Sequence, residues 1–153
     1  MSSDKLDVTA GAPNYFIHTG SGNDALVLLG GTNAVDGGGG SNFLAGGAGT
    51  DTFYVDGRGA ASDIWSKVAN FHPGDSATVF GVSPGVDALA WADNQGTAGF
   101  TGLELHAAAA GRPTASLTLA GLTQADMAAG RLAVQYGYDA ASGSDYLCVH
   151  DNR

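Results

Sequence analysis

Cysteine, lysine, arginine and glutamate are scarce in this chain of 153 residues. The single cysteine, Cys148, excludes an internal disulfide and a zinc site built from several cysteines. Only six Lys and Arg residues face fifteen acidic residues, so the net charge is −9. Because no basic cluster offsets this charge, the composition excludes a protein that binds the phosphate backbone of nucleic acid.

Long apolar runs are also missing. No apolar stretch approaches the roughly 18 residues that a membrane-spanning helix needs, so we expect no membrane span. The first residues, MSSDKLDVTAGAP, contain neither a basic region nor an apolar region, and we expect no secretory signal peptide.

Glycine and aspartate are abundant instead. Glycine accounts for 25 residues, about twice its usual share, and all the acidic residues except Glu104 are aspartates. Aspartate favours turns and binds hard cations, whereas glutamate favours helices. The composition therefore predicts one small domain that is rich in turns and poor in helix.

A nine-residue repeat organises residues 19–54. The units TGSGNDALV, LLGGTNAVD, GGGGSNFLA and GGAGTDTFY approach the pattern G-G-x-G-x-D-x-U-x, in which U is a large apolar residue. The sixth position holds Asp24, Asn33, Asn42 and Asp51, and the eighth holds Leu26, Val35, Leu44 and Phe53. An earlier, degenerate unit keeps Gly11 and Ile17 in the same register. A glycine-rich linker would not keep an apolar residue at every ninth position, and a phosphate-binding loop would need a lysine, which the repeats lack.

This pattern resembles the RTX, or hemolysin-type calcium-binding, nonapeptide repeat. The resemblance implies that each glycine-rich half forms a turn and that each x-U-x half forms a short strand with the eighth side chain inward. Two units complete a coil, so alternate turns stack. We expect an all-β fold: a short right-handed parallel β-roll at 19–56, preceded by a lead-in and decayed first repeat at 1–18. An antiparallel β-sandwich-like cap at 57–153 should follow it.

The resemblance also implies Ca²⁺ between stacked turns, held by backbone carbonyls and sixth-position carboxylates. One site would use Asp24 and Asn42 with Gly22 and Gly40, and the other would use Asn33 and Asp51 with Gly31 and Gly49. Each pair has one carboxylate where the family pattern has two. The sequence therefore predicts weak sites, or occupation of only one, and leaves open a scaffold that holds no calcium.

Residues 57–85 resemble the segment that follows the repeats in extracellular RTX proteins such as serralysin-type proteases and alginate epimerase modules. The matching residues are Val68, Asn70, Phe71, Gly74 and Asp75, and Asn70 stands where an aspartate is usual. Asp63 lies earlier in this stretch. It could cap the last calcium site, or it could simply begin a turn.

The remainder of the chain reads as short strands separated by turns. The expected strands are 88–92, 102–107, 115–120, 131–136 and 146–150, with Tyr136 in the core. A single helical turn is expected at 123–129, because Thr123 can cap it with Asp126 three residues later and Gly130 can end it.

No pattern in the sequence indicates catalysis. The four histidines lack metal-binding spacing, no G-x-S-x-G occurs, and the glutamate has no second carboxylate with which to flank a cleft. Three aromatic residues, Trp91, Tyr138 and Tyr146, suggest a different activity, because an exposed ring beside polar side chains can stack on a sugar. Packing in a sandwich core explains the same aromatics.

Two functions follow from these observations. The first is a non-catalytic calcium-binding RTX module of a secreted bacterial protein, which supports type I secretion and calcium-coupled folding outside the cell. Its partners would be calcium and, through the C-terminal end, the type I secretion machinery. The alternative is an extracellular carbohydrate-binding module, attached to a polysaccharide-acting enzyme or an adhesin, that binds a neutral polysaccharide.

Overall fold

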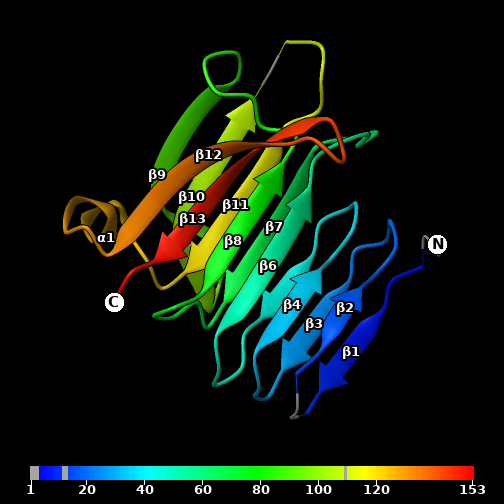
Figure 1. Ribbon diagram of the computed structural model, residues 1–153, viewed down its shortest axis with the longest axis vertical. Helices are drawn as coiled ribbons and strands as arrows, with labels where there is room; N and C mark the ends of the chain where they lie inside the picture. Colours follow the sequence, from blue (N-terminus) through cyan, green and yellow to red (C-terminus); the bar gives the residue numbers. More distant parts are fainter. Residues whose placement is uncertain (1–3, 12–13, 109) are drawn as a thin grey trace.

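The computed structural model describes residues 4–11, 14–108 and 110–153 as strands and one short helix (Figure 1). Residues 1–3 and 12–13 of the predicted lead-in therefore lie outside the described part. The elements are β1 (Asp7–Ala10), β2 (Phe16–His18), β3 (Ala25–Leu28), β4 (Asn33–Asp36), β5 (Phe43–Ala45), β6 (Asp51–Asp56), β7 (Ile64–Ala69), β8 (Ser76–Phe80), β9 (Ala88–Thr97), β10 (Phe100–Ala108), β11 (Ala115–Ala120), α1 (Gln124–Ala128), β12 (Leu132–Asp139) and β13 (Ser144–Asp151).

The strands form two facing sheets. The seven-stranded sheet has the order β1-β3-β5-β7-β11-β10-β9, and the six-stranded sheet has the order β12-β13-β8-β6-β4-β2. From β1 to β8 the chain passes alternately from one sheet to the other, and we call this part the coiled segment. Within it every strand pairs in parallel with the strand two places along the chain.

The predicted fold class, a short parallel β-roll followed by a separate antiparallel β-sandwich-like cap, is wrong. Both sheets continue past the repeats: β7 and β8 pair in parallel with β5 and β6, and β11 adds in parallel to β7. The result is a fold of two mixed, mostly parallel sheets. The physical reason is that the last repeat strand of each layer leaves a row of backbone N–H and C=O groups unpaired, and the next strands satisfy them by joining the same sheet.

The spacing of the coils changes where the repeat ends. Paired residues are 18 apart from β1 to β6, as in Asn33 and Asp51, but 24 apart from β5 to β8, as in Phe43 and Lys67. The longer coil accommodates the extended strand β6 and the loop at 57–63. The glycine pattern therefore stops while the parallel pairing continues.

The eighth-position side chains lie in the core between the sheets, as the register predicted. Leu26, Val35, Leu44 and Phe53 are all fully buried. The same core continues beyond the repeats through Val68 and through the buried side chains of β8, β10, β11 and β13. One apolar layer therefore joins the repeats to the downstream half.

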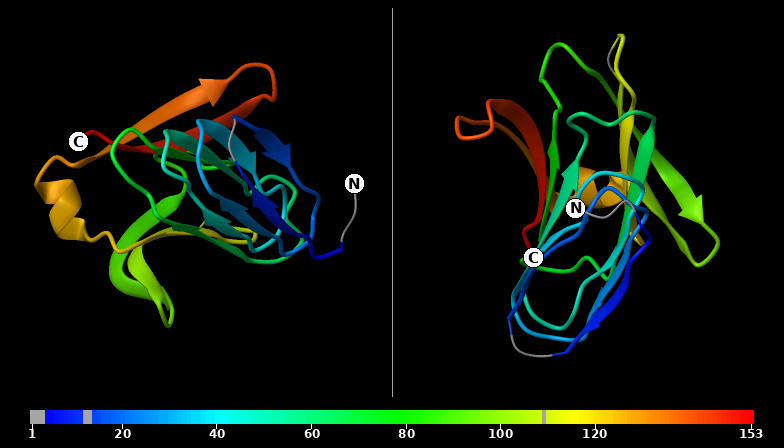
Figure 2. Two further views of the ribbon diagram at one scale, coloured as in Figure 1. Left: turned by 90° about the horizontal axis from the view of Figure 1, so that it is seen from below. Right: turned by 90° about the vertical axis from the view of Figure 1, so that its right-hand side faces the viewer.

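The downstream strands form two antiparallel hairpins, β9–β10 and β12–β13, which lie on opposite sides of the molecule (Figure 2). Among the described strands, β12 pairs only with β13 and forms the border of its sheet. Tyr136, which we expected in the core, is half exposed at 50%, because β12 is a border strand whose burial falls from Leu132 towards its second half.

The predicted helical turn is confirmed. Thr123 precedes α1, the Asp126 carboxylate accepts the backbone N–H of Thr123, and Gly130 follows with a φ of +73°. Among the described residues, no helix is long and apolar enough to cross a membrane.

Replacing Gly49 by alanine should destabilise the protein by about 1–3 kcal/mol, because the added Cβ would collide with the backbone carbonyl of Gly31 in the turn beneath. Within the described part of the chain, a Cβ at Gly11 would meet nothing within 4 Å, so Gly11→Ala serves as the control. Urea unfolding of both variants measures the difference. Equal midpoints would show that the turns do not approach as closely as the structure describes.

Candidate functional site

The sixth-position side chains form hydrogen-bonded ladders along the two edges of the coiled segment. Asn42 Oδ1 accepts the backbone N–H of Asp24 at 2.9 Å, and Asp51 Oδ1 accepts that of Asn33 at 3.1 Å. The structure thus brings together the two pairs that the repeat register predicted. The ladder continues beyond the repeats, where Asp75 Oδ1 accepts the N–H of Asp51 at 2.8 Å.

The first candidate cation position is the turn at 19–24. Asp24 is 2% exposed, and its Oδ1 accepts the N–H of Leu6 at 2.9 Å. Its other oxygen, Oδ2, is buried without a hydrogen-bond partner among the described residues, and so is Oγ1 of Thr19 in the same turn. An unpartnered buried carboxylate oxygen is costly, so the residues of this turn fit a cation.

The second candidate position, at Asn33 and Asp51, is already satisfied by protein donors. Asp51 Oδ1 accepts from the Asn33 side chain at 2.7 Å, and Oδ2 accepts the N–H of Gly47 at 2.8 Å. Both carboxylate oxygens therefore have donors. The residues of this turn do not fit a bound calcium ion.

The glycines predicted as ligands have a steric role in the stacking. A Cβ on Gly40 would collide with the Gly22 carbonyl, and one on Gly49 would collide with the Gly31 carbonyl. Stacked turns therefore touch through their backbones, and only glycine permits this approach.

A third turn, at 70–75, contains contacts that sequence reasoning missed. Asn70 adopts a φ of +57°, and its amide donates to the carbonyls of Gly46 and Gly47 at 2.8 and 3.1 Å. His72 Nε2 lies 2.8 Å from the Gly47 carbonyl oxygen, and its Nδ1 lies 3.4 Å from the buried carboxylate of Asp75. The only sequence signal was the resemblance of this stretch to the family's segment after the repeats.

Two pKa values are shifted in this turn. The Gly47 carbonyl, and then Asp75 and Asp51, raise the pKa of His72 above its ordinary value, against the effect of burial. Burial raises the pKa of Asp75, although its hydrogen bonds to the backbone of Asp51 and His72 oppose this. Protonation of His72 is thus more favourable in the folded chain than in the unfolded chain.

The contribution of His72 to stability should therefore be complete below about pH 6.5 and should fall as pH rises through the raised folded-state pKa. His72→Gln keeps a donor for Gly47 without a titrating charge, so its melting temperature should change less than that of the wild type between about pH 6 and pH 8.5. His106→Gln, at a half-exposed strand position, is the control. A His72→Gln profile parallel to that of the wild type would contradict this role.

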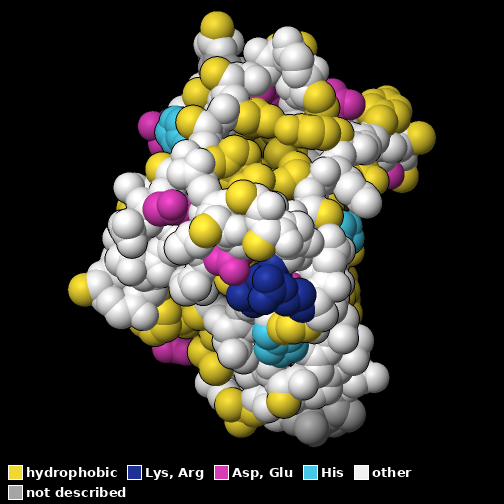
Figure 3. All heavy atoms as spheres, turned by 90° about the vertical axis from the view of Figure 1, so that its left-hand side faces the viewer, with side chains coloured by type: hydrophobic (Ala, Val, Ile, Leu, Met, Phe, Trp, Pro, Cys, Tyr) yellow, Lys and Arg dark blue, Asp and Glu magenta, His cyan; other side chains and the backbone are white. Residues whose placement is uncertain are grey.

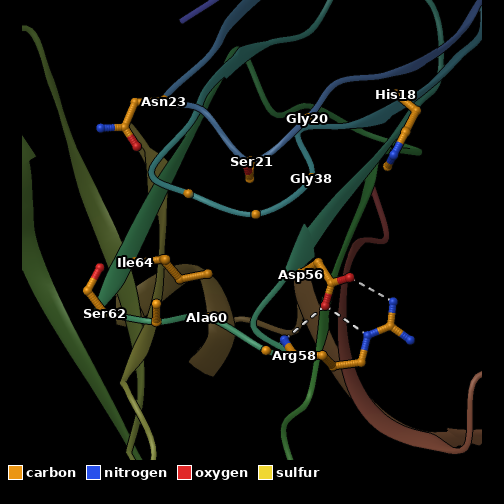
Figure 4. Close-up of a pocket in the computed structure, with 14 residues that line it drawn as sticks. His18, Gly20, Ser21, Asn23, Gly38, Asp56, Arg58, Ala60, Ser62 and Ile64 are labelled. Carbon is orange, nitrogen blue, oxygen red and sulfur yellow. Dashed lines mark hydrogen bonds and ion pairs between the residues drawn. The ribbon is translucent and has the colours of Figure 1, made fainter. Parts of the chain in front are cut away.

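Asp63 does not face the stacked turns. Its carboxylate accepts the N–H of Thr114 at 2.7 Å, and this bond lowers its pKa. The loop at 57–63 instead closes a pocket of about 550 Å³ against the turns at 19–24 and 37–42 (Figure 4). At its wall Arg58 donates two hydrogen bonds of 2.8 Å to Asp56. Burial opposes ionisation of Asp56, but these bonds outweigh it and lower the pKa.

The aromatic residues predicted to bind a ligand are divided between the two sheets. Tyr138 and Tyr146 line one open groove of about 440 Å³ on the outer side of the six-stranded sheet, formed by β6, β8, β12 and β13. Trp91 lies on β9 in the other sheet, where it packs against the core. Of the three, only the two tyrosines therefore line the same groove.

The groove contains further rings and polar groups that the sequence did not reveal. The rings of Tyr54 and Phe80 stack with centroids 6.1 Å apart, and Tyr146 meets Phe80 edge-on at 5.8 Å. The remaining lining side chains are polar or small, namely Thr52, Ser76, Thr78, Gln135, Asp139, Cys148 and His150. Burial raises the pKa of Cys148, so its thiol stays protonated and is a poor nucleophile.

The surface on the side of α1 carries one apolar region and one basic cluster (Figure 3). On the side where α1 lies, hydrophobic side chains gather in the upper part of the surface, and Lys and Arg form one compact cluster near its centre (Figure 3). No group of three or more His, Cys, Asp or Glu side chains that could hold a metal ion occurs in the described ranges.

No protein-family model and no curated protein matches this chain.

Proposed function

We propose that this protein is a non-catalytic, calcium-responsive module of the RTX type, from a secreted bacterial protein. The observation that carries the proposal is the buried Oδ2 of Asp24, which has no hydrogen-bond partner among the described residues. Thr19 Oγ1, in the same turn, is also buried without a hydrogen-bond partner among the described residues. The repeat register supplies the reason to choose calcium, because oxygen ligands in glycine-rich turns suit this ion.

In this proposal Asp24 and Thr19 hold the ion together with backbone carbonyls of the turn. A bound calcium ion supplies positive charge that neutralises the buried carboxylate. Asp24 meanwhile continues to accept the N–H of Leu6, so it links the turn to the segment before β1. Ordering of this end of the coiled segment therefore depends on calcium.

Calcium dependence has a biological consequence within the same proposal. Calcium is scarce inside the bacterial cell and abundant outside it, so the first coil would order only after export. The module would thus stay incompletely folded during type I secretion and fold in the extracellular medium. No reaction is assigned to it.

Calcium should raise the melting temperature, with a stabilisation of about 2.7 kcal/mol at a hundredfold excess over its dissociation constant. With only one carboxylate in the turn, we expect a weak affinity of about 0.1–1 mM. Asp24→Asn should abolish the response. Calorimetric scans with calcium and with chelator measure both effects, and a wild-type melting temperature indifferent to either would contradict the proposal.

A second candidate function, carbohydrate binding, is favoured by the groove on the six-stranded sheet. Tyr138, which is 64% exposed, and the half-buried Tyr146 both line this groove, together with its hydroxyl and amide groups. Such a combination suits a sugar, whose apolar face packs on a ring and whose hydroxyls form hydrogen bonds. Because the chain carries a net charge of −9, the ligand would be a neutral polysaccharide rather than a polyanion.

Tyr138→Ala and Tyr146→Ala should remove retention on an insoluble neutral polysaccharide while leaving the calcium response unchanged. Tyr136→Ala is the matched control, since this tyrosine is also exposed on β12 but does not line the groove. Wild-type protein that binds no polysaccharide, with or without calcium, would eliminate this candidate.

A further inference from the structure

We propose that asparagine amides and His72 replace calcium in the turns that follow residue 24. Their hydrogen bonds to the carbonyls of a turn, each set of which we call a lock, hold these turns without any cation. The inference deepens the proposed calcium function, because it states which turns do not need the ion. It rests on where the side-chain N–H groups point in three successive turns.

Asn42 provides the first lock. Its Oδ1 accepts the N–H of Asp24, and its Nδ2 donates to the carbonyls of Gly37 and Gly40 at 2.9 and 3.4 Å. The amide cannot be reversed, because reversal would place its NH₂ group against the N–H of Asp24. The donor therefore occupies the side of the turn where the carbonyls converge.

Asn33 provides the second lock on the opposite edge. Its Oδ1 accepts the N–H of Tyr15 at 3.0 Å, which determines the orientation of the amide. Its Nδ2 donates to the carbonyl of Gly30 at 3.1 Å and to Asp51 at 2.7 Å. One amide group thus donates hydrogen bonds both to a carbonyl and to the neighbouring carboxylate.

The third lock lies one coil further along the same edge. The Asn70 amide donates to the carbonyls of Gly46 and Gly47, and His72 contacts the Gly47 carbonyl from the same turn. The carbonyls of the turn at 46–50 are therefore bound by side chains from the turn at 70–75.

The turn at 19–24 lacks such a lock. Thr19, Gly22 and Asp24 stand 18 residues before Gly37, Gly40 and Asn42, so Asp24 Oδ2 corresponds to the Nδ2 atom of Asn42. That oxygen has no donor among the described residues, whereas the amide nitrogen has two acceptors. The contrast indicates what an aspartate requires at this position: a cation in place of the two N–H groups.

Asn33→Asp is the main test, because it would place two carboxylates next to each other in a buried turn. With chelator present its melting temperature should fall by about 5 °C or more, and calcium should restore it. The variant is best made also in the Asp24→Asn background. A new calcium response there supports the inference even if the wild type shows none, so the two proposals can fail separately.

Asn70→Asp is the second variant, because Asn70 is exposed whereas Asn33 is buried. Asn94→Asp is its matched control, because Asn94 is also exposed and has a similar φ of +60° but lies on β9. We expect calcium-reversible destabilisation for Asn70→Asp and no change for Asn94→Asp. The inference is overturned if Asn70→Asp and Asn33→Asp melt like the wild type in chelator, or if calcium does not restore their loss. Should Asn33→Asp fail to fold in either condition, Asn70→Asp decides.

Discussion

Replacing Phe53 by alanine should lower the free energy of unfolding by about 3–5 kcal/mol. Phe53 is fully buried between the two sheets, and its ring lies 6.2 Å from that of Phe71, centroid to centroid. The truncation removes apolar contacts that Phe53 makes between the two sheets. It also leaves a cavity, which two hydrogen-bonded sheets cannot close. Chemical denaturation of wild type and variant gives the difference directly.

The matched control is Phe16→Ala, on β2 of the same sheet, where the ring is 73% exposed. Its effect should stay within about 0.5 kcal/mol, because a surface ring loses few contacts. Similar losses for the two variants would mean that the eighth repeat position does not form the core.

Replacing Arg131 by methionine should destabilise the fold by about 3–5 kcal/mol, because it leaves the Asp151 carboxylate buried without its cation. Arg131 donates from Nε and Nη2 to Asp151 Oδ2 at 2.9 and 2.7 Å, and the side chain of Asp151 is fully buried. Asp151 also exchanges backbone hydrogen bonds with Gly74 and Asp75, so the pair joins the C-terminal strand to the turn that follows the repeats.

Two further variants isolate this ion pair. Arg58→Met breaks a more exposed pair with Asp56 and should cost about 1 kcal/mol or less. The double variant Arg131→Met with Asp151→Leu should regain part of the lost stability, because no buried charge then remains unpaired. If the double variant is less stable than Arg131→Met alone, the loss does not arise from the isolated carboxylate.

The sequence predicted correctly those features that depend on the spacing of residues close together in the chain. The nine-residue period identified the inward positions, since Leu26 and Phe53 must face the core whichever sheet each strand joins. The cap at Thr123 and Asp126 involves residues three apart, and it formed as expected. The stacked pairs of sixth-position residues followed from the same arithmetic.

The sequence was misleading where the result depends on which strands become neighbours. It placed a boundary at the end of the glycine pattern, but backbone pairing does not depend on glycine, and β7, β8 and β11 extended the parallel layers. Alternation likewise placed Tyr136 in the core. Its strand is at the sheet border, and that side chain is half exposed.

By itself, then, the sequence determined the repeat, the inward side chains and the choice of asparagine or aspartate at each sixth position. Only the tertiary structure decided what those polar side chains do. The direction of an amide depends on a backbone N–H donor 18 residues away, as at Asn42 and Asp24. The contact of His72 with Gly47, 25 residues earlier, exists only once the coils are stacked.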